Sequence, residues 1–266
     1  MGNFTPKNIR SIILRMAYSG STVHIGCAFS IVELMSVLYR NHLNYPDDNP
    51  NAELRDYLIL SKGHGVMAQY ACLYEKSWLN ENHINKYFAD GSDLKGLSDA
   101  HVVGCEVTSG TLGHGLSVGV GLALAAKLNK TEQTYYVIVG DGEMNEGTMW
   151  EAMLFASHHN LDNLIIIVDK NDHQAMGRTK DVLNLGALEE KFKSFNFEVL
   201  NIDGHNEVEI NAAINTLKKQ KNNSPKAIIA KTIKGKGVSF MEDNNIWHYT
   251  RLTNDTFNNA IAELNL

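Results

Sequence analysis

Five short, largely apolar runs are spaced along the chain. The runs at 135–139 and 164–168 are continuous and rich in β-branched residues, and they are bounded by Gly, Asp and Asn. Such runs are typical of strands that are buried on both faces of a parallel sheet. We therefore predict strands at residues 57–60, 135–139, 164–168, 197–202 and 227–232.

Other segments carry the apolar spacing of helices. Thr5 precedes Pro6, and a threonine N-cap followed by proline at the first helical position is a common helix start. The segment 20–26, with a glycine at each end, is expected to end that helix and to place His24 on a loop. The apolar positions that give the first helix its spacing are Ile9, Ile12, Ile13 and Met16.

Two further helices follow from the pattern. Apolar residues at helical spacing predict a second helix with one apolar face. Residues 116–128 are small and apolar almost throughout, which predicts a buried helix that begins near Gly113 and Gly115. The apolar face of the second helix comprises Ile31, Leu34, Met35 and Leu38.

Strands and helices alternate along the chain, which is the pattern of α/β proteins with a doubly wound, mostly parallel sheet flanked by helices. The polar stretch 218–225 is expected to be a surface loop, and no segment has the composition of a linker. We therefore predict a single domain that comprises residues 1–266.

Composition and charge exclude several classes of protein. The net charge is −6 and no basic cluster is present, which argues against nucleic acid as a partner. Cys27, Cys72 and Cys105 lack the spacing of a zinc site, so we expect buried, reduced thiols. Because no signal peptide and no membrane-length apolar run is seen, we expect a cytoplasmic protein with no membrane partner.

The most informative chemistry follows two of the predicted strands. Asp141 lies between Gly140 and Gly142 directly after one strand, and Asn171 follows the next. Ligands of parallel sheets bind at the carboxyl ends of the strands. A carboxylate and an amide oxygen suit a hard divalent cation that keeps its other positions for phosphate oxygens and water. The pattern therefore predicts a diphosphate site built through a metal, although Asp-Gly alone is also typical of a turn.

The segment from Gly140 to Asn171 resembles the thiamine-diphosphate motif of the transketolase family, which is GDG followed after about thirty residues by Asn. Further blocks resemble the same family in the same order and cover nearly the whole chain. They are Ser61-Lys-Gly-His-Gly65, Gly110-Thr-Leu-Gly-His-Gly115, Gly140 to Gly147 with Trp150-Glu-Ala, and Lys234 to Phe240 with Trp247-His248.

The resemblance implies thiamine diphosphate and Mg²⁺ as cofactors. It assigns the metal to the side chains of Asp141 and Asn171 and to the backbone carbonyl of His173. Asp172 stands where the family has a second asparagine. The cofactor contacts that the resemblance implies are His64, Gly110, Leu112, Gly113, Gly140, Gly142 and Glu143.

The resemblance to the transketolase family implies that four residues take part in catalysis. His24 and His248 match the family histidines that line the channel to the cofactor, where a neutral imidazole suits proton transfer between sugar oxygens. His64 is implied at the cofactor, and Glu146 matches a glutamate that meets its counterpart across a subunit interface. Taken alone, His24 could equally be a polar loop residue, and Glu146 could be a first-turn helix carboxylate. Tyr249 replaces the glycine that usually follows the histidine at 248.

Two features of the family are not found. A His-Pro-Glu segment, whose histidine contacts the donor ketose, normally precedes the loop at Gly110. Here the matching stretch is Gly96-Leu97-Ser98, and His101 aligns with a later residue. The glutamate that activates the cofactor lies in a second domain of the family. The chain thus resembles the N-terminal subunit of a split transketolase, with a separate pyrimidine-binding C-terminal subunit as its partner.

These features imply an enzyme that transfers a two-carbon ketol unit from a ketose donor to an aldehyde or ketone acceptor. Two alternatives are an acyl transfer from a 2-oxo acid onto a specialised sugar and a non-catalytic cofactor-binding scaffold. Family precedent implies a heterotetramer. We expect the interface at residues 116–128 and 146–155, because a half-enzyme leaves an apolar face uncovered.

Overall fold

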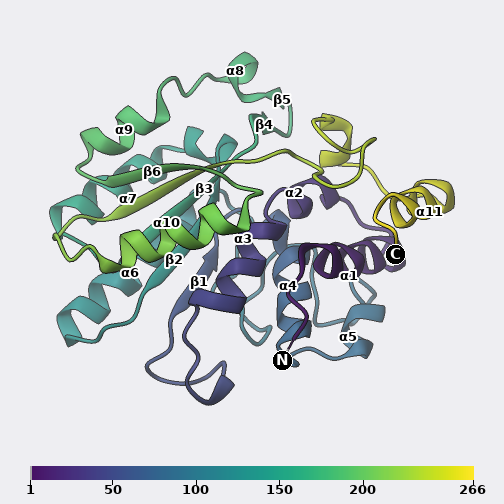
Figure 1. Ribbon diagram of the computed structural model, residues 1–266, viewed down its shortest axis with the longest axis horizontal. Coiled ribbons are helices and arrows are strands. Elements are labelled where there is room, and N and C mark those ends of the chain that lie inside the picture. The colour runs from purple at the N-terminus through teal and green to yellow at the C-terminus, as the bar shows by residue number, and fades with distance from the viewer. Residues whose placement is uncertain (1) are drawn as a thin grey trace.

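The computed structural model describes residues 2–266 and contains a parallel five-stranded sheet between two layers of helices (Figure 1). The strand order is β1-β2-β3-β7-β6, and every pairing in this sheet is parallel. The strands are β1 (Tyr57–Leu60), β2 (Tyr135–Gly140), β3 (Leu164–Lys170), β6 (Glu198–Asp203) and β7 (Lys226–Lys231). All five predicted strands are therefore confirmed, as is the α/β fold class.

Alternate residues of each strand face two separate apolar cores. In β3, Ile165 and Ile167 belong to one core, whereas Ile166 and Val168 belong to the other. All four side chains are almost completely buried. Burial on both faces explains why the strand sequences are continuous apolar runs rather than alternating ones.

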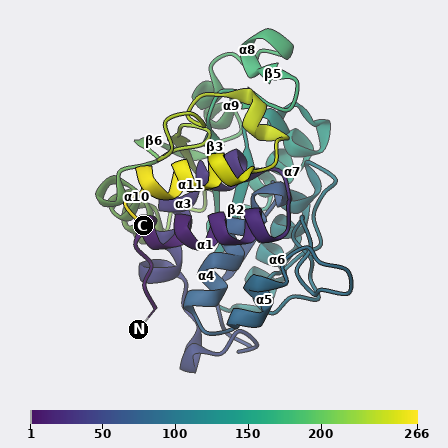
Figure 2. The same cartoon turned by 90° about the vertical axis from the view of Figure 1, so that its right-hand side faces the viewer.

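The first core is covered by a layer of helices that includes those at both ends of the chain. The α11 helix packs against α1, and Lys7 Nζ donates to the Asn265 carbonyl at 2.8 Å, which fixes the C-terminal segment beside the first helix (Figure 2). The helices of this layer are α1 (Pro6–Ser19), α2 (Ile25–Phe29), α3 (Val32–Val37), α4 (Val66–Glu75), α5 (Glu81–Asn85), α10 (Glu207–Lys219) and α11 (Asn254–Glu263).

The second core lies on the opposite face of the sheet. It is covered by α6 (His114–Asn129), α7 (Gly147–His158) and α9 (Leu188–Ser194). The α6 helix begins directly after Gly113, which has a positive φ of 86° that glycine adopts without strain. The predicted start of this helix is thus confirmed.

Three predictions about local structure need correction. The α6 helix is only half buried, since Val118 and Leu128 on its outer side are exposed. The second predicted helix divides into α3 and a π-helical turn at Leu38–His42. The α3 helix is buried on all sides because it lies under α1, α4 and α10. The α10 helix extends to Lys219, so the polar loop begins at residue 220 rather than 218.

The loop after β3 contains elements that the sequence pattern did not predict. The two-residue strands β4 (His173–Gln174) and β5 (Gly177–Arg178) form an antiparallel hairpin, followed by α8 (Thr179–Val182). Within residues 2–266, no helix has both the length and the apolar character needed to cross a membrane.

Candidate functional site

A cavity of about 470 Å³ lies at the carboxyl ends of β1, β2 and β3. This is the size of a small-molecule site, and it lies where a parallel sheet is expected to bind its ligand. The cavity brings together twelve of the thirteen residues singled out from the sequence: His24, His64, Gly110, Leu112, Gly140, Asp141, Gly142, Glu143, Glu146, Asn171, His173 and His248.

Asp141, Asn171 and His173 all line the cavity, and we refer to the oxygen atoms that they offer as the oxygen cluster. Both oxygens of Asp141 accept backbone N–H groups, from Gly142 at 2.8 Å and from Asp172 at 2.6 Å. Asn171 Oδ1 accepts the His173 N–H at 3.0 Å. Each oxygen keeps a lone pair, and carboxylate, amide and carbonyl oxygens are the donors that Mg²⁺ binds. The residues present therefore fit a hard divalent cation.

The environment of Asp141 also favours a bound cation. Burial, together with the nearby Asp169 carboxylate, raises the pKa of Asp141 to about 7. Burial makes the ionised form of this carboxylate unfavourable, and a divalent cation beside it would stabilise that form.

A buried ion pair lies beneath the cluster. Lys62 Nζ donates to Asp169 Oδ2, and Asn171 Nδ2 donates to the same oxygen at 2.9 Å. Ser30 and Thr232 donate to Asp169 as well. Burial opposes both charges, but their mutual attraction lowers the pKa of Asp169 and raises that of Lys62. The pair thus orients Asn171 from β3 while a positive charge is kept near the cavity.

Glu143 connects the loops that surround the cavity. Its Oε1 accepts from Ser61 Oγ at 2.6 Å and from Gly113 N at 2.8 Å, and its Oε2 accepts from Gly140 N at 3.1 Å. Gly113 is the one predicted site residue that does not line the cavity, but it belongs to the hydrogen-bond network of Glu143. The carboxylate of Glu143 is occupied by protein donors, so it shapes the site by holding three loops together.

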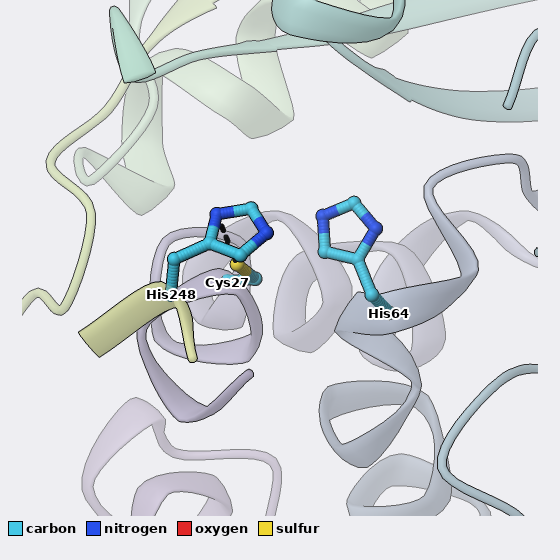
Figure 3. Close-up of side chains that lie close together, drawn as sticks. All are labelled: Cys27, His64 and His248. Atoms are coloured by element: carbon cyan, nitrogen blue, oxygen red, sulfur yellow. Dashed lines mark hydrogen bonds between the residues drawn. The ribbon is translucent and has the colours of Figure 1, made fainter. Parts of the chain in front are cut away.

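Three imidazoles form a triangle in the same cavity. The ring centroids of His24, His64 and His248 lie 5.5 Å from one another. Figure 3 shows the rings of His64 and His248 facing each other across a gap, with the Cys27 thiol beside His248. The Cys27 Sγ lies 3.7 Å from His248 Nδ1. The three histidines come from the start of α2, the loop after β1 and the last loop, so only the fold brings them together.

All three imidazoles are neutral near pH 7. Burial and Lys234 lower the pKa of His248 to about 3. Burial is also the main cause that lowers the pKa of His24 and that holds the pKa of His64 well below its usual range. Lys234 Nζ donates to His248 Nδ1 at 2.6 Å. His248 therefore carries its proton on Nε2.

Lys234→Met is expected to raise the pKa of His248, because removal of a neighbouring positive charge favours the imidazolium. The pKa should remain below that of a free histidine, since burial persists. A titration of the His248 ring protons by NMR measures the shift. Lys236→Met is the matched control, because Lys236 belongs to the same loop but pairs with Glu242 at 3.2 Å. An unchanged pKa in Lys234→Met would contradict the assigned contact.

His24 has a left-handed backbone conformation, with φ 71° and ψ 15°, directly before α2. A residue other than glycine is rare in this region and costs free energy there. The predicted loop position is confirmed, and the strain fits a residue that is kept for its side chain.

The remaining residues named in the sequence analysis lie at the edge of the cavity or outside it. Glu146 lies exposed at the start of α7. Leu97, which belongs to the stretch that matches the family's His-Pro-Glu segment, lines the cavity. His101 pairs with Asp99 at 2.7 Å on the surface and does not line the cavity. Tyr249 is 70 % exposed and lies 5.7 Å from His24 between ring centroids.

The sequence pattern gave no role to Lys62, Lys234, Asp169, Gln174 or Cys27. Both lysines belong to sequence blocks that resemble the family, and membership of these blocks is the feature that could have identified them as site residues. Asp169 follows directly after a predicted strand. Cys27 is buried, as are Cys72 and Cys105, and all three thiols are free as predicted.

An exposed apolar surface lies on α6 and α7, which pack against each other. It contains large apolar side chains on the outer sides of both helices. Large apolar side chains that are exposed on two adjoining helices are candidates for a site of interaction. We refer to Val118, Leu128, Leu154 and Phe155 as the α6–α7 face.

Comparison with known proteins gives a family match over residues 6–265, to the family described as "Transketolase, thiamine diphosphate binding domain". One of the relatives is named as a subunit of apulose-4-phosphate transketolase from Actinobacillus succinogenes. It is 42% identical over 258 residues, which is 96% of this chain and 92% of that protein. The 6-deoxy-6-sulfo-D-fructose transketolase subunit SqwG of Clostridium sp. is 38% identical over 257 residues, which is 96% of this chain and 93% of that protein.

The fold is also similar to that of solved structures. Transketolase from Leishmania mexicana superimposes with a TM-score of 0.88 at 28% identity, over 98% of this chain and 41% of that protein. The chain thus spans about two fifths of the length of this relative.

Proposed function

Because the chain belongs to the transketolase family, whose thiamine-diphosphate-binding domain it matches over residues 6–265, we propose that it is the diphosphate-binding subunit of a two-component transketolase-like enzyme. The enzyme transfers a two-carbon ketol unit from a ketose donor to an aldehyde or ketone acceptor. The observation that carries the proposal is the presence of the oxygen cluster and three neutral imidazoles in one cavity.

The chain acts as one domain and holds the metal end of the cofactor. Mg²⁺ is bound by the Asp141 carboxylate, Asn171 Oδ1 and the His173 carbonyl. The ammonium groups of Lys62 and Lys234 favour an anionic group in the same cavity. When bound, thiamine diphosphate supplies the electron sink for the two-carbon unit.

The histidines handle protons on the substrate. His248 Nε2 carries a proton and donates it as a hydrogen bond to a substrate oxygen, because Nδ1 accepts from Lys234. His24 is neutral and can accept a proton from a substrate hydroxyl. His64 lines the same cavity and would contact the cofactor.

His24→Ala is expected to lower kcat/KM by about 10²–10⁴-fold, which is the usual contribution of a general acid–base group. Affinity for the cofactor should remain nearly unchanged, since His24 faces the substrate. Steady-state kinetics and cofactor titration of the assembled enzyme measure the two quantities. His101→Ala is the matched control, because that histidine lies on the surface outside the cavity. An unchanged kcat/KM in His24→Ala would contradict a role of His24 in proton transfer.

The partner is a pyrimidine-binding subunit on a separate chain. Two relatives of nearly the same length are named as subunits of transketolases, which supports a divided enzyme. The α6–α7 face supplies the apolar surface that association requires. Glu146 lies exposed at the start of α7, and family precedent pairs it with its counterpart in a heterotetramer. The three free cysteines are in keeping with a cytoplasmic location.

A second candidate is an acyl transfer from a 2-oxo acid onto a specialised sugar. Leu97 favours it, because the stretch 96–98 holds no histidine that could contact a ketose and presents this apolar side chain to the cavity instead.

A donor screen on the complex of this chain with its partner tests the proposal. Ketoses, ketose phosphates and 2-oxo acids are each offered with an aldehyde acceptor, and the products are identified by mass spectrometry. An aldose two carbons shorter than the ketose donor, together with an acceptor extended by two carbons, is the expected result. Release of CO₂ from a 2-oxo acid would support the second candidate. Cofactor binding without turnover of any donor would instead indicate a non-catalytic scaffold.

A further inference from the structure

Gln174 forms part of the cavity wall. It lies on β4 directly after His173 and pairs with Gly177 across the β4–β5 hairpin. Asn245 Nδ2 donates to the carbonyl of the next residue, Ala175, at 3.1 Å. The backbone at Gln174 is therefore held from two sides.

The side chain of Gln174 begins beside the Gly140–Gly142 turn. A Cβ built on Gly142 would lie 2.7 Å from the Gln174 Cβ, so only glycine allows this approach. Gln174 thus adjoins Asp141 and lies at the metal end of the cavity, next to the predicted oxygen cluster.

The Nε2 atom of Gln174 is buried and has no hydrogen-bond partner among residues 2–266. Other buried polar atoms in the described chain share this condition, such as Ser36 Oγ in α3, but Gln174 alone among them belongs to a residue that lines the cavity. A buried amide N–H without an acceptor costs free energy, and a bound ligand that supplies the acceptor removes this cost.

We propose that the Gln174 amide donates a hydrogen bond to an anionic oxygen of the diphosphate that is bound through the metal. The inference rests on the proposed function, because it requires that ligand. A hydrogen bond from an amide N–H to an anionic oxygen is stronger than one to a neutral acceptor. Since the neighbours of Gln174 are Gly142 and the metal-binding residues, the diphosphate is the part of the cofactor that it reaches.

The test compares wild type, Gln174→Met and Gln174→Glu in the assembled complex. Calorimetric titration with magnesium thiamine diphosphate should show a Kd about 10- to 100-fold higher for Gln174→Met. Gln174→Glu should bind more weakly still, because a carboxylate repels the diphosphate. The melting temperature without ligand should be unchanged or higher in Gln174→Met, since a buried unpaired N–H is removed.

Two further probes separate a contact from a structural role. Magnesium pyrophosphate should show the same loss of affinity as the full cofactor, whereas thiamine, which has no phosphate, should bind wild type and Gln174→Met alike. Ser36→Ala is the matched control, because it removes a buried unpaired hydroxyl of a residue that does not line the cavity, and it should leave all affinities unchanged.

The outcomes are distinguishable. If wild type binds the cofactor and Gln174→Met binds it equally well, the contact is wrong while the proposed function stands. A loss that is confined to thermal stability, with normal affinity for pyrophosphate, would also overturn the contact. If wild type itself fails to bind magnesium thiamine diphosphate, the proposed function fails first.

Discussion

Asp141→Ala is expected to abolish magnesium-dependent binding of thiamine diphosphate. Asp141 supplies the only carboxylate among the three oxygen groups proposed to hold the metal, and its oxygens are already fixed by two backbone N–H donors. Without it, the diphosphate would face the protein without its charge neutraliser. Calorimetric titration of the assembled complex at several magnesium concentrations measures the effect, and additional magnesium should not restore binding.

Asp172→Asn provides the control for Asp141→Ala. Asp172 has a positive φ of 61°, which asparagine tolerates, and its side chain pairs with Lys170 at 2.5 Å rather than with the oxygen cluster. The backbone N–H that Asp141 accepts is retained in this variant. Affinity close to that of wild type is therefore expected. Unchanged affinity in Asp141→Ala would remove the metal assignment.

The second large effect concerns the chain without its partner. We expect the purified chain, saturated with thiamine diphosphate and magnesium, to have no measurable ketol transfer. Two of the carboxylates that line the cavity, Asp141 and Glu143, have their oxygens bonded to protein donors, and the third, Glu146, lies exposed at the rim. None is free within the cavity to activate the pyrimidine ring of the cofactor. Addition of the partner subunit should restore turnover.

A coupled assay that detects the aldehyde product measures this difference. The chain is assayed alone, then with increasing amounts of partner, and activity should saturate when the two are equimolar. The Asp141→Ala chain mixed with the same partner is the control for contaminating transketolase. Robust turnover by the pure chain alone would contradict the division of the enzyme into two subunits.

The fold could be predicted because its strands are buried on both faces. A run such as residues 164–168 has no polar position to confuse the assignment, and its neighbours Asp169 and Asn171 mark where the strand ends. The site followed from the same pattern, since the carboxyl ends of parallel strands lie at one edge. Asp141 and Asn171 were therefore brought together by an inference that required no side-chain geometry.

The remaining features depend on information that periodicity does not carry. The buried ion pair of Lys62 and Asp169 was missed because charged residues are rarely buried, so a pattern treats them as surface. The β4–β5 hairpin has strands of two residues, which is too short for any period, and Gln174 was missed with it. The α6 helix is apolar all round, so its sequence could not separate the core side from the exposed side.

The exposed α6–α7 face bears on how the chain behaves when it is made. A subunit that displays Leu128 at 72 % and Leu154 at 61 % exposure has apolar surface that self-associates when the proper partner is scarce. Synthesis of one half in excess should therefore yield aggregated or rapidly degraded protein, whereas matched synthesis should yield dispersed complex. Balanced production of the two halves then becomes a requirement of the surface itself, in addition to any requirement of catalysis.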